Sequence, residues 1–313
     1  MSSRHLVDPE VAPLLDLWPT TTLTTENLPL ARNRRMPLPP FDTAGVTLDR
    51  RAVPGPVGAP DIMLHIYRPE GAAGPLPAIY HIHGGGYVLG AAETLEGPHR
   101  GLVKALGCVI VSVDYRLAPE TVFPGAIEDC YAGLRWLFGA AGALEVDEAR
   151  IGVMGESAGG GLAAALALLA RDRGEFPLAF QHLIYPMLDD RTCIAADPNP
   201  HVGEFIWTPA NNRFGWSALL GREPGGEGVS PYAAAARAKD LSGLPPAFIS
   251  TGSLDLFLEE DMEYARRLLR AGVPTEFHVF PGGFHAYDVM PGARLSEAAR
   301  AASLSALRRF LHG

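Results

Sequence analysis

Short apolar runs alternate with longer amphipathic stretches along most of this chain, and the alternation predicts an α/β fold. Eight runs have the length and side-chain content of strands, at about residues 46–52, 61–67, 77–83, 108–114, 151–155, 180–185, 246–251 and 275–280. Helical periodicity is present at residues 129–138, 160–171, 259–270 and 296–311. This order predicts an eight-stranded, mostly parallel sheet flanked by helices, with an antiparallel edge formed by the closely spaced first strands.

Two stretches do not follow this alternation. Residues 1–44 are helical and rich in proline, and residues 187–225 are inserted between two strands. An insertion at that point would lie over the carboxyl edge of the sheet as a helical cap, although one extra helix packed in the core is an alternative. We therefore expect a two-part cap and one catalytic domain, which comprises residues 45–186 and 226–313.

The composition fits one sizeable α/β domain, because the 313 residues are 47% hydrophobic and can bury a large core. A net charge of −9 argues against nucleic acid and anionic membranes as partners, since no basic tract is present. The three widely spaced cysteines match neither a disulfide framework nor a zinc site, and no metal or other cofactor is expected. No apolar run has the length of a membrane span or of a signal-sequence core, so we expect a cytoplasmic protein.

The most informative motif is Gly-Glu-Ser-Ala-Gly at residues 155–159, which follows the apolar run 151–154 and precedes a small, apolar run at 160–170. This order predicts a strand, a sharp turn and a helix. At such a turn the serine is held in a strained conformation with its Oγ exposed at the edge of the sheet, and only small neighbours let the strand and the helix approach closely. Ser157 is therefore the candidate nucleophile.

A glycine triplet lies upstream, directly after the apolar run 78–82. Its backbone N–H groups are unshielded by any Cβ, and acyl transfer from a serine needs such donors where the carbonyl oxygen becomes an oxyanion. We assign the oxyanion hole to the N–H groups of Gly85, Gly86 and Ala158. A flexible turn or a phosphate-binding nest is the alternative, but the lysine and hydroxyl residues of a phosphate loop do not follow.

A base and an orienting acid are expected downstream of the nucleophile, each just after a strand. Asp255 and His285 follow the last two strand candidates. Both side chains would then emerge at the carboxyl edge of a parallel sheet, where the nucleophile also lies. The acids that follow Asp255 fit the first turns of a helix and are expected to face solvent; they are Glu259, Glu260 and Asp261.

Aromatic side chains are expected to form the pocket that holds the substrate. Phe205, Trp207 and Phe214 lie in the inserted stretch, where they would line an apolar acyl or alcohol pocket beneath the cap. Tyr87, the first residue after the glycine triplet, is expected to line the same pocket.

Taken together, these motifs resemble the hormone-sensitive lipase family of α/β-hydrolases, also known as bacterial esterase family IV. The similarity rests on His-Gly-Gly-Gly at 83–86, on Asp-Tyr-Arg-Leu-Ala-Pro-Glu at 114–120, and on residues 155–160, and it runs from about residue 60 to the C-terminus. The resemblance implies a cofactor-free carboxylesterase that favours short to medium acyl chains. It also implies a two-part cap and frequent homodimerisation through the last strand and helix.

The chain departs from the usual pattern of the family at two positions. Many members have Asp where this chain has Glu156, and many have Pro where it has Leu256 after the candidate acid. We interpret Glu156 as a change in a contact near the nucleophile that leaves the turn itself intact. His81 and His83 flank the start of the glycine loop and are interpreted as structural residues that hydrogen-bond it.

The predicted function is hydrolysis of small-molecule esters by a serine carboxylesterase, through a Ser157-His285-Asp255 triad and an acyl-enzyme. A lipase that acts on longer acyl chains is one alternative, and an amidase or peptidase is another. A ligand-binding module on the same fold is a third. The presence of His285 argues against that module, because the hormone receptors of this family have lost the catalytic histidine.

Overall fold

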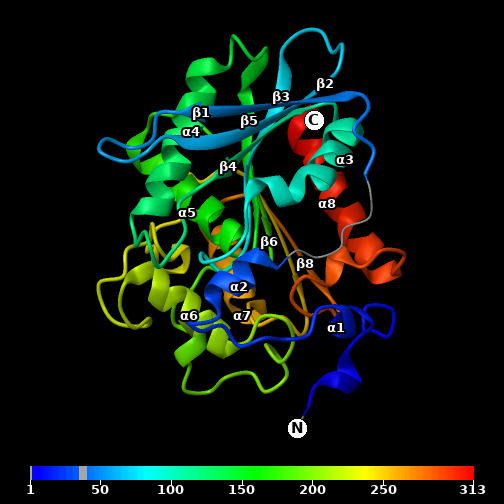
Figure 1. The fold of residues 1–313 in the computed structure, drawn as a ribbon, viewed down its shortest axis with the longest axis vertical. Helices are drawn as coiled ribbons and strands as arrows, with labels where there is room; N and C mark the ends of the chain where they lie inside the picture. Colours follow the sequence, from blue (N-terminus) through cyan, green and yellow to red (C-terminus); the bar gives the residue numbers. More distant parts are fainter. Residues whose placement is uncertain (1, 35–40) are drawn as a thin grey trace.

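The computed structural model describes residues 2–34 and 41–313, and these residues form one eight-stranded sheet (Figure 1). The strands are β1 (Val46–Val53), β2 (Ile62–Pro69), β3 (Leu76–Ile82), β4 (Val109–Asp114), β5 (Val146–Glu156), β6 (Gln181–Ile184), β7 (Ala247–Gly252) and β8 (Thr275–Phe280). Their spatial order is β1-β2-β4-β3-β5-β6-β7-β8, in which β2 pairs antiparallel with both β1 and β4 and all the other pairs are parallel. The predicted fold, a mostly parallel sheet with an antiparallel edge, is confirmed.

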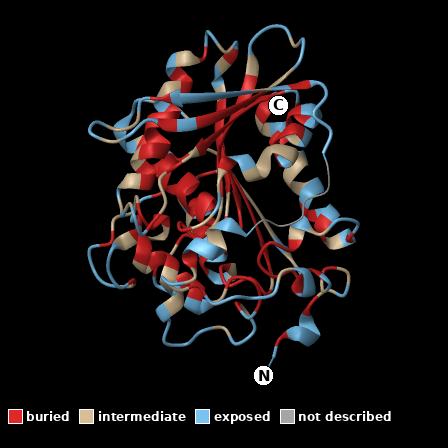
Figure 2. Cartoon of the chain, viewed as in Figure 1, coloured by how far each residue is buried: buried red, intermediate tan, exposed pale blue. Residues whose placement is uncertain are grey.

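Helices cover both faces of this sheet. One apolar cluster joins Tyr80 of β3 to helices α4 (Gly125–Ala140), α5 (Ala158–Arg173) and α7 (Leu258–Arg270). A second cluster joins Ile79 of β3 to helices α3 (Glu96–Leu106) and α8 (Arg294–His312). Because successive side chains of a strand point to opposite faces, the two clusters lie on opposite sides of the sheet. The result is a three-layer sandwich whose interior is buried (Figure 2).

Helix α3 was not predicted from the sequence. It contains two glycines and a proline, and its buried side consists of His99, Arg100, Val103 and Leu106. Two of these four buried side chains are polar, so the apolar periodicity that marks a surface helix is weak.

Helix α5 is buried on all sides, since every residue from Ala158 to Ala170 is buried. Its first half consists almost entirely of glycine and alanine, and these small side chains let it pack closely against β5 and β6. The helix therefore starts directly at the carboxyl end of β5, where Ser157 is the residue before its first turn.

The two stretches that were expected to form a cap lie side by side. The first contains α1 (Leu14–Leu17) and α2 (Leu28–Asn33), and the second contains α6 (Pro209–Leu220) (Figure 1). The Asn211 side chain joins them, because its Oδ1 accepts a hydrogen bond from the N–H of Leu23 at 2.8 Å. Residues 1 and 35–40 of the first stretch lie outside the described residues.

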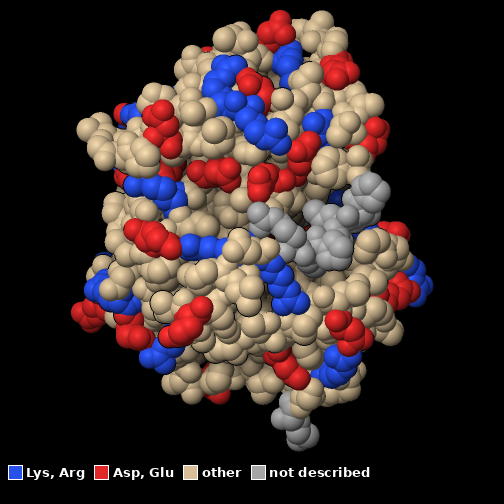
Figure 3. Space-filling model, viewed as in Figure 1, with Lys and Arg blue, Asp and Glu red and all other residues tan. Residues whose placement is uncertain are grey.

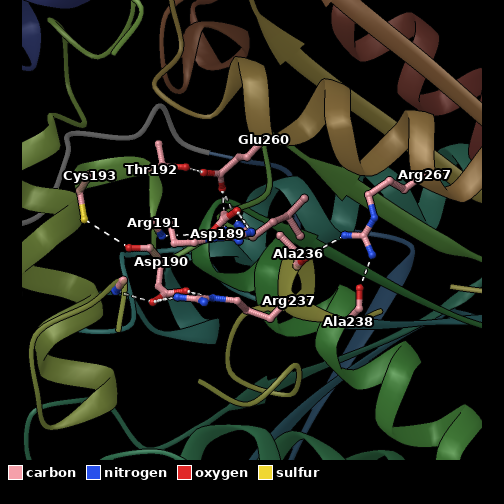
Figure 4. A network of polar contacts seen from close by, with 12 residues as sticks. Asp189, Asp190, Arg191, Thr192, Cys193, Ala236, Arg237, Ala238, Glu260 and Arg267 are labelled. Carbon is pink, nitrogen blue, oxygen red and sulfur yellow. Dashed lines mark hydrogen bonds and ion pairs between the residues drawn. The ribbon is translucent and has the colours of Figure 1, made fainter. Parts of the chain in front are cut away.

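The acids at the start of α7 do not all face solvent, as had been expected. Glu259 is exposed, whereas Glu260 and Asp261 have relative exposures of only 8% and 0%. Glu260 accepts hydrogen bonds from the N–H groups of Leu188 (2.6 Å) and Asp189 (3.2 Å), where the inserted stretch leaves the sheet (Figure 4). The prediction was wrong because these donors lie about seventy residues upstream, beyond the reach of a local helical pattern.

Asp190 holds the two ends of the inserted stretch together. Its buried carboxylate pairs with Arg237 at 2.8 and 2.9 Å, and it accepts a hydrogen bond from the N–H of Gly225 at 2.6 Å (Figure 4). Since residues 190 and 225 lie near the beginning and the end of the stretch, one carboxylate fixes both to the catalytic domain.

The surface carries charges of both signs. On the face shown in Figure 3, arginines and lysines lie interspersed with aspartates and glutamates. Within residues 2–34 and 41–313, no helix combines the length and the apolar character needed to cross a bilayer.

Candidate active site

Ser157 occupies the sharp turn between β5 and α5. Its backbone has φ 56° and ψ −122°, a conformation that L-residues adopt only at a cost. The N–H of Ser157 donates to the carbonyl of Ile184 at 2.9 Å, which fixes the turn against β6. A Cβ at Gly159 would overlap the carbonyl oxygens of Ile82 and His83 on the neighbouring strand. Glycine is therefore required there, and the predicted strand, turn and helix are all present.

The candidate acid and base lie beside this serine. His285 follows β8, and its Nε2 lies 3.0 Å from Oγ of Ser157. Its Nδ1 lies 2.9 Å from Oδ2 of Asp255, which follows β7. The other oxygen of Asp255 accepts a hydrogen bond from the N–H of Phe257 at 3.0 Å, so the carboxylate is held from both sides. The structure thus brings together the three residues that the sequence singled out, in the geometry of a Ser-His-Asp relay.

The glycine loop lies next to Ser157, since a Cβ at Gly84 would lie 3.4 Å from the Cβ of the serine. Ala158 is the first residue of α5, and the N–H of a first helical residue has no partner inside its helix. In the described part of the chain, no carbonyl or side chain accepts a hydrogen bond from the N–H of Gly85 or Gly86. Three backbone donors are therefore free for a ligand oxygen near the serine.

His83 shapes this loop. Its Nδ1 lies 2.9 Å from the carbonyl of Gly84, and its ring stacks on Tyr115 with centroids 4.3 Å apart. The hydroxyl of Tyr115 donates to the carbonyl of His83 at 3.0 Å. Burial lowers the pKa of His83, so its imidazole is neutral and holds the loop through a hydrogen bond.

Glu156 connects the turn to the neighbouring strand. Both of its carboxylate oxygens lie near Nε2 of His81 on β3, at 2.9 and 3.0 Å. The His81 ring is 1% exposed, and its Nδ1 lies 3.3 Å from the hydroxyl of Ser112 on β4. The position where this chain departs from the family pattern therefore makes a contact that reaches two strands.

Aromatic side chains surround the imidazole. The rings of Tyr185, Phe257 and Trp207 lie 4.8, 5.3 and 6.3 Å from that of His285. The sequence interpretation had included only Trp207. Tyr185 directly follows β6, and aromatic residues at carboxyl ends of parallel strands are the signal that could have identified it.

The other residues expected to line the pocket differ in their placement. Phe205 packs edge to face against Phe284, next to the candidate base, and Phe214 of α6 is half-buried. Tyr87 is 1% exposed; its hydroxyl donates to the carbonyl of Met187 at 3.0 Å. The Tyr87 side chain therefore supports the base of the inserted stretch, and its role in lining the pocket stays a prediction.

The site leaves little surface open to solvent. Ser157 and His285 are each 6% exposed, and Trp207 is 7% exposed. In the described residues, no group of three or more His, Cys, Asp or Glu side chains is arranged to hold a metal ion. The arrangement can supply a nucleophile, a base with its orienting acid, and oxyanion donors, all in a nearly dry setting.

This chain is similar to known hydrolases and esterases. A family model described as the alpha/beta hydrolase fold matches residues 79–289. The chain is 37% identical to carboxylesterase NlhH of Mycobacterium tuberculosis, over 99% of this chain and 98% of that protein. It is 34% identical to esterase LipI of the same organism, over 99% of this chain and 97% of that protein. Among solved structures, bacterial heroin esterase has a TM-score of 0.92 and 39% identity, with full coverage of both chains.

Proposed function

This chain belongs to the α/β-hydrolase family, of the hormone-sensitive lipase type, and is a carboxylic ester hydrolase; from that premise we propose that Ser157, His285 and Asp255 are its catalytic residues. The observation that carries the proposal is the pair of hydrogen bonds that joins one imidazole to the hydroxyl at 3.0 Å and to the carboxylate at 2.9 Å. The substrates we propose are esters of small molecules with short to medium acyl chains.

In the proposed reaction, His285 takes the hydroxyl proton of Ser157 as Oγ attacks the ester carbonyl carbon. Asp255 accepts the Nδ1–H hydrogen bond, which keeps Nε2 free to act as the base and stabilises the imidazolium. The imidazolium then gives its proton to the alkoxide that leaves, and the acyl group stays on Oγ. Water, deprotonated by His285, attacks this acyl-enzyme and releases the acid.

The negative charge of each tetrahedral intermediate falls on the former carbonyl oxygen. We propose that the N–H groups of Gly85, Gly86 and Ala158 stabilise it. Each such donor typically contributes ~10²–10³ in rate, because it is already oriented where the charge develops. The N-terminus of α5 adds its dipole at the same point.

We propose that residues 1–44 and 187–225 form the cap over the catalytic domain of residues 45–186 and 226–313. Support comes from Phe205 and Trp207, which the inserted stretch places beside the candidate base. An apolar, aromatic setting of this kind favours neutral esters, since a charged substrate group would lose its hydration without gaining a partner.

The test is hydrolysis of p-nitrophenyl esters from two to sixteen acyl carbons by the native protein and by Ser157→Ala. We expect turnover that peaks at short to medium chains and falls by ~10⁴–10⁶ in kcat in the variant, with unchanged circular dichroism. A folded Ser157→Ala protein that retains most of its activity would contradict the assignment. A peak at the longest chains would favour a lipase, and parallel assays with anilides separate an amidase.

We further propose that the protein forms a homodimer through β8 and α8. β8 is the last strand in the sheet order, and most of its residues are only partly buried. An unpaired strand edge is a template for pairing with another copy. Sedimentation velocity over a range of protein concentrations tests this proposal. The cytoplasmic location stays a prediction from the sequence.

A further inference from the structure

Trp207 lies directly against the oxyanion loop. A Cβ at Gly86 would overlap the six-membered ring of the Trp207 indole, and a Cβ at Gly215 of α6 would overlap the carbonyl of Gly86. The indole Nε1 points the other way and donates to Oδ1 of Asn212 at 3.2 Å. The ring therefore fills the space beside the proposed oxyanion donors and is held at both of its ends.

The backbone that carries this ring is strained. Ile206 has φ 60°, and the N–H of Trp207 donates to the carbonyl of Phe205 at 2.7 Å, which closes a three-residue γ-turn around Ile206. A positive φ at a β-branched residue is an outlier, because its branched Cβ crowds the backbone. Such residues persist only where their surroundings impose them, and they concentrate at sites that change conformation or hold a ligand.

The N-terminal stretch imposes this turn. Oγ1 of Thr20 accepts a hydrogen bond from the N–H of Ile206 at 3.0 Å. The Ile206 and Phe205 side chains belong to one apolar cluster with Val11 and Leu14. The N-terminal stretch thus holds the turn at Ile206 both through a hydrogen bond and through apolar contacts.

The site is almost closed to solvent in this structure, with Ser157 at 6% and Trp207 at 7% exposure. Because the indole lies beside both Gly86 and the ring of His285, a bulky ester group that enters the site meets it. Displacing the indole breaks its hydrogen bond to Asn212, and the strained residue Ile206 directly precedes it. Strain that is relieved on opening brings the open state closer in free energy to the closed one.

We propose that Trp207 determines the size of the ester groups that this site accepts, and that the strained turn at Ile206 is the hinge on which it opens. This inference rests on the proposed esterase function at Ser157. Small groups, such as an acetyl, fit beside the closed indole, whereas longer groups require the open state and are hydrolysed with a lower kcat/KM.

The first test compares the native protein with Trp207→Phe and Trp207→Ala. Two ester series are used: p-nitrophenyl esters with two to twelve acyl carbons, and acetates of alcohols with one to eight carbons. We expect the ratio of kcat/KM for the longest to the shortest substrate to rise at least tenfold in Trp207→Ala, in at least one series, with a smaller rise in Trp207→Phe. Trp136→Phe, which changes an indole on α4 that packs against Arg51 of the edge strand β1, should leave both ratios unchanged.

A second pair of variants tests the hinge without altering any residue near the substrate. Thr20→Val removes the acceptor for the N–H of Ile206, whereas Thr21→Val changes a neighbour whose hydroxyl donates to the carbonyl of Pro19. We expect Thr20→Val to raise the long-to-short ratio two- to fivefold with unchanged acetate hydrolysis, and Thr21→Val to have no effect.

The outcomes separate the two proposals. If both series keep their native profiles in Trp207→Ala, while that variant still hydrolyses acetate and Ser157→Ala does not, the size-selection inference is overturned and the esterase proposal stands. If the native protein hydrolyses none of these esters, the proposed function itself is wrong. Equal effects of Thr20→Val and Thr21→Val would overturn the role of the hinge.

Discussion

The two sides of the active site are built in different ways. We call the residues at the carboxyl ends of the strands, which include Ser157, Asp255 and His285, the floor, and residues 2–34 and 187–225 the roof. Each floor residue lies within a few positions of a strand that is fixed by the ladder of the sheet. The roof contributes no strand to the sheet, and it is held by side chains that bond backbone groups, such as Asn211 and Glu260, and by the apolar cluster that contains Val11 and Phe205. We therefore expect the floor to carry out the chemistry and the roof to select among substrates.

Backbone strain is concentrated where floor and roof meet. Among the described residues, six that are not glycine have a positive φ: Tyr87, Glu145, Ser157, Tyr185, Ile206 and Ala286. Only Glu145 lies away from the site. Strain of this kind costs of order 1–3 kcal/mol per residue and is retained where geometry matters for function.

The largest expected effect is on the floor. His285→Ala removes the base, and we expect kcat for a p-nitrophenyl ester to fall by ~10⁴–10⁶. Circular dichroism and thermal melting should show an intact fold, because the side chain lies at the edge of the sheet. A His285→Ala protein whose kcat stays within tenfold of the native value would contradict the assignment of the chemistry to the floor.

A smaller loss should follow from changing the acid. Asp255→Asn replaces the acceptor that orients the imidazole, and we expect kcat to fall by about 10³–10⁴. Asp261→Asn is the matched control, since it changes a buried aspartate on the following helix that makes no contact with His285. Similar losses in both variants would show that the effect is structural.

The base of the roof should be important for stability. Asp190→Ala leaves the guanidinium of Arg237 and the N–H of Gly225 without their partner, and we expect the free energy of unfolding to fall by about 3 kcal/mol. Asp189→Ala removes a carboxylate that pairs with Arg191 and should cost less, because the half-exposed guanidinium stays hydrated without its partner. Urea denaturation of both variants measures these losses. Equal losses in the free energy of unfolding would contradict the prediction.

The smallest expected effect concerns pH. Burial raises the pKa of Asp261 well above its ordinary value, and the charges of Glu260 and Asp255 raise it further. Above pH ~4 the unfolded chain releases the proton of Asp261, whereas the folded protein keeps it bound. The native protein therefore loses stability as the pH rises above that value. Asp261→Asn carries no such proton. We expect its free energy of unfolding to match that of the native protein near pH 4 and to exceed it by a margin that grows as the pH rises towards 7.

Urea denaturation at several pH values provides this measurement. Glu263→Gln is the control, because Glu263 is an exposed acid on the same helix whose pKa Arg266 lowers. Its removal should change stability little at either pH. A difference between Asp261→Asn and the native protein that shrinks as the pH rises would contradict the prediction.

More of the floor than of the roof could be predicted from the sequence. The strands and the turn at Ser157 were predictable because their signals are local: apolar runs, small residues and a serine at fixed spacing. The structure brings Asp255 and His285 to that serine because parallel strands present their carboxyl ends at one edge. Helix α3 was missed because polar side chains occupy part of its buried face. The burial of Glu260 was missed because its hydrogen-bond donors come from the inserted stretch, not from its own helix.

By itself, the sequence determined the order of the eight strands along the chain, and it predicted the candidate nucleophile, its two partners and the donors beside them. Each of these depends on a residue and its nearest neighbours along the chain. Only the tertiary structure decided that Tyr87 supports the core, that Trp207 covers Gly86, and that Thr20 holds the turn at Ile206. These contacts join segments that are up to about 190 residues apart, and such contacts depend on how the whole chain packs, which no local pattern encodes.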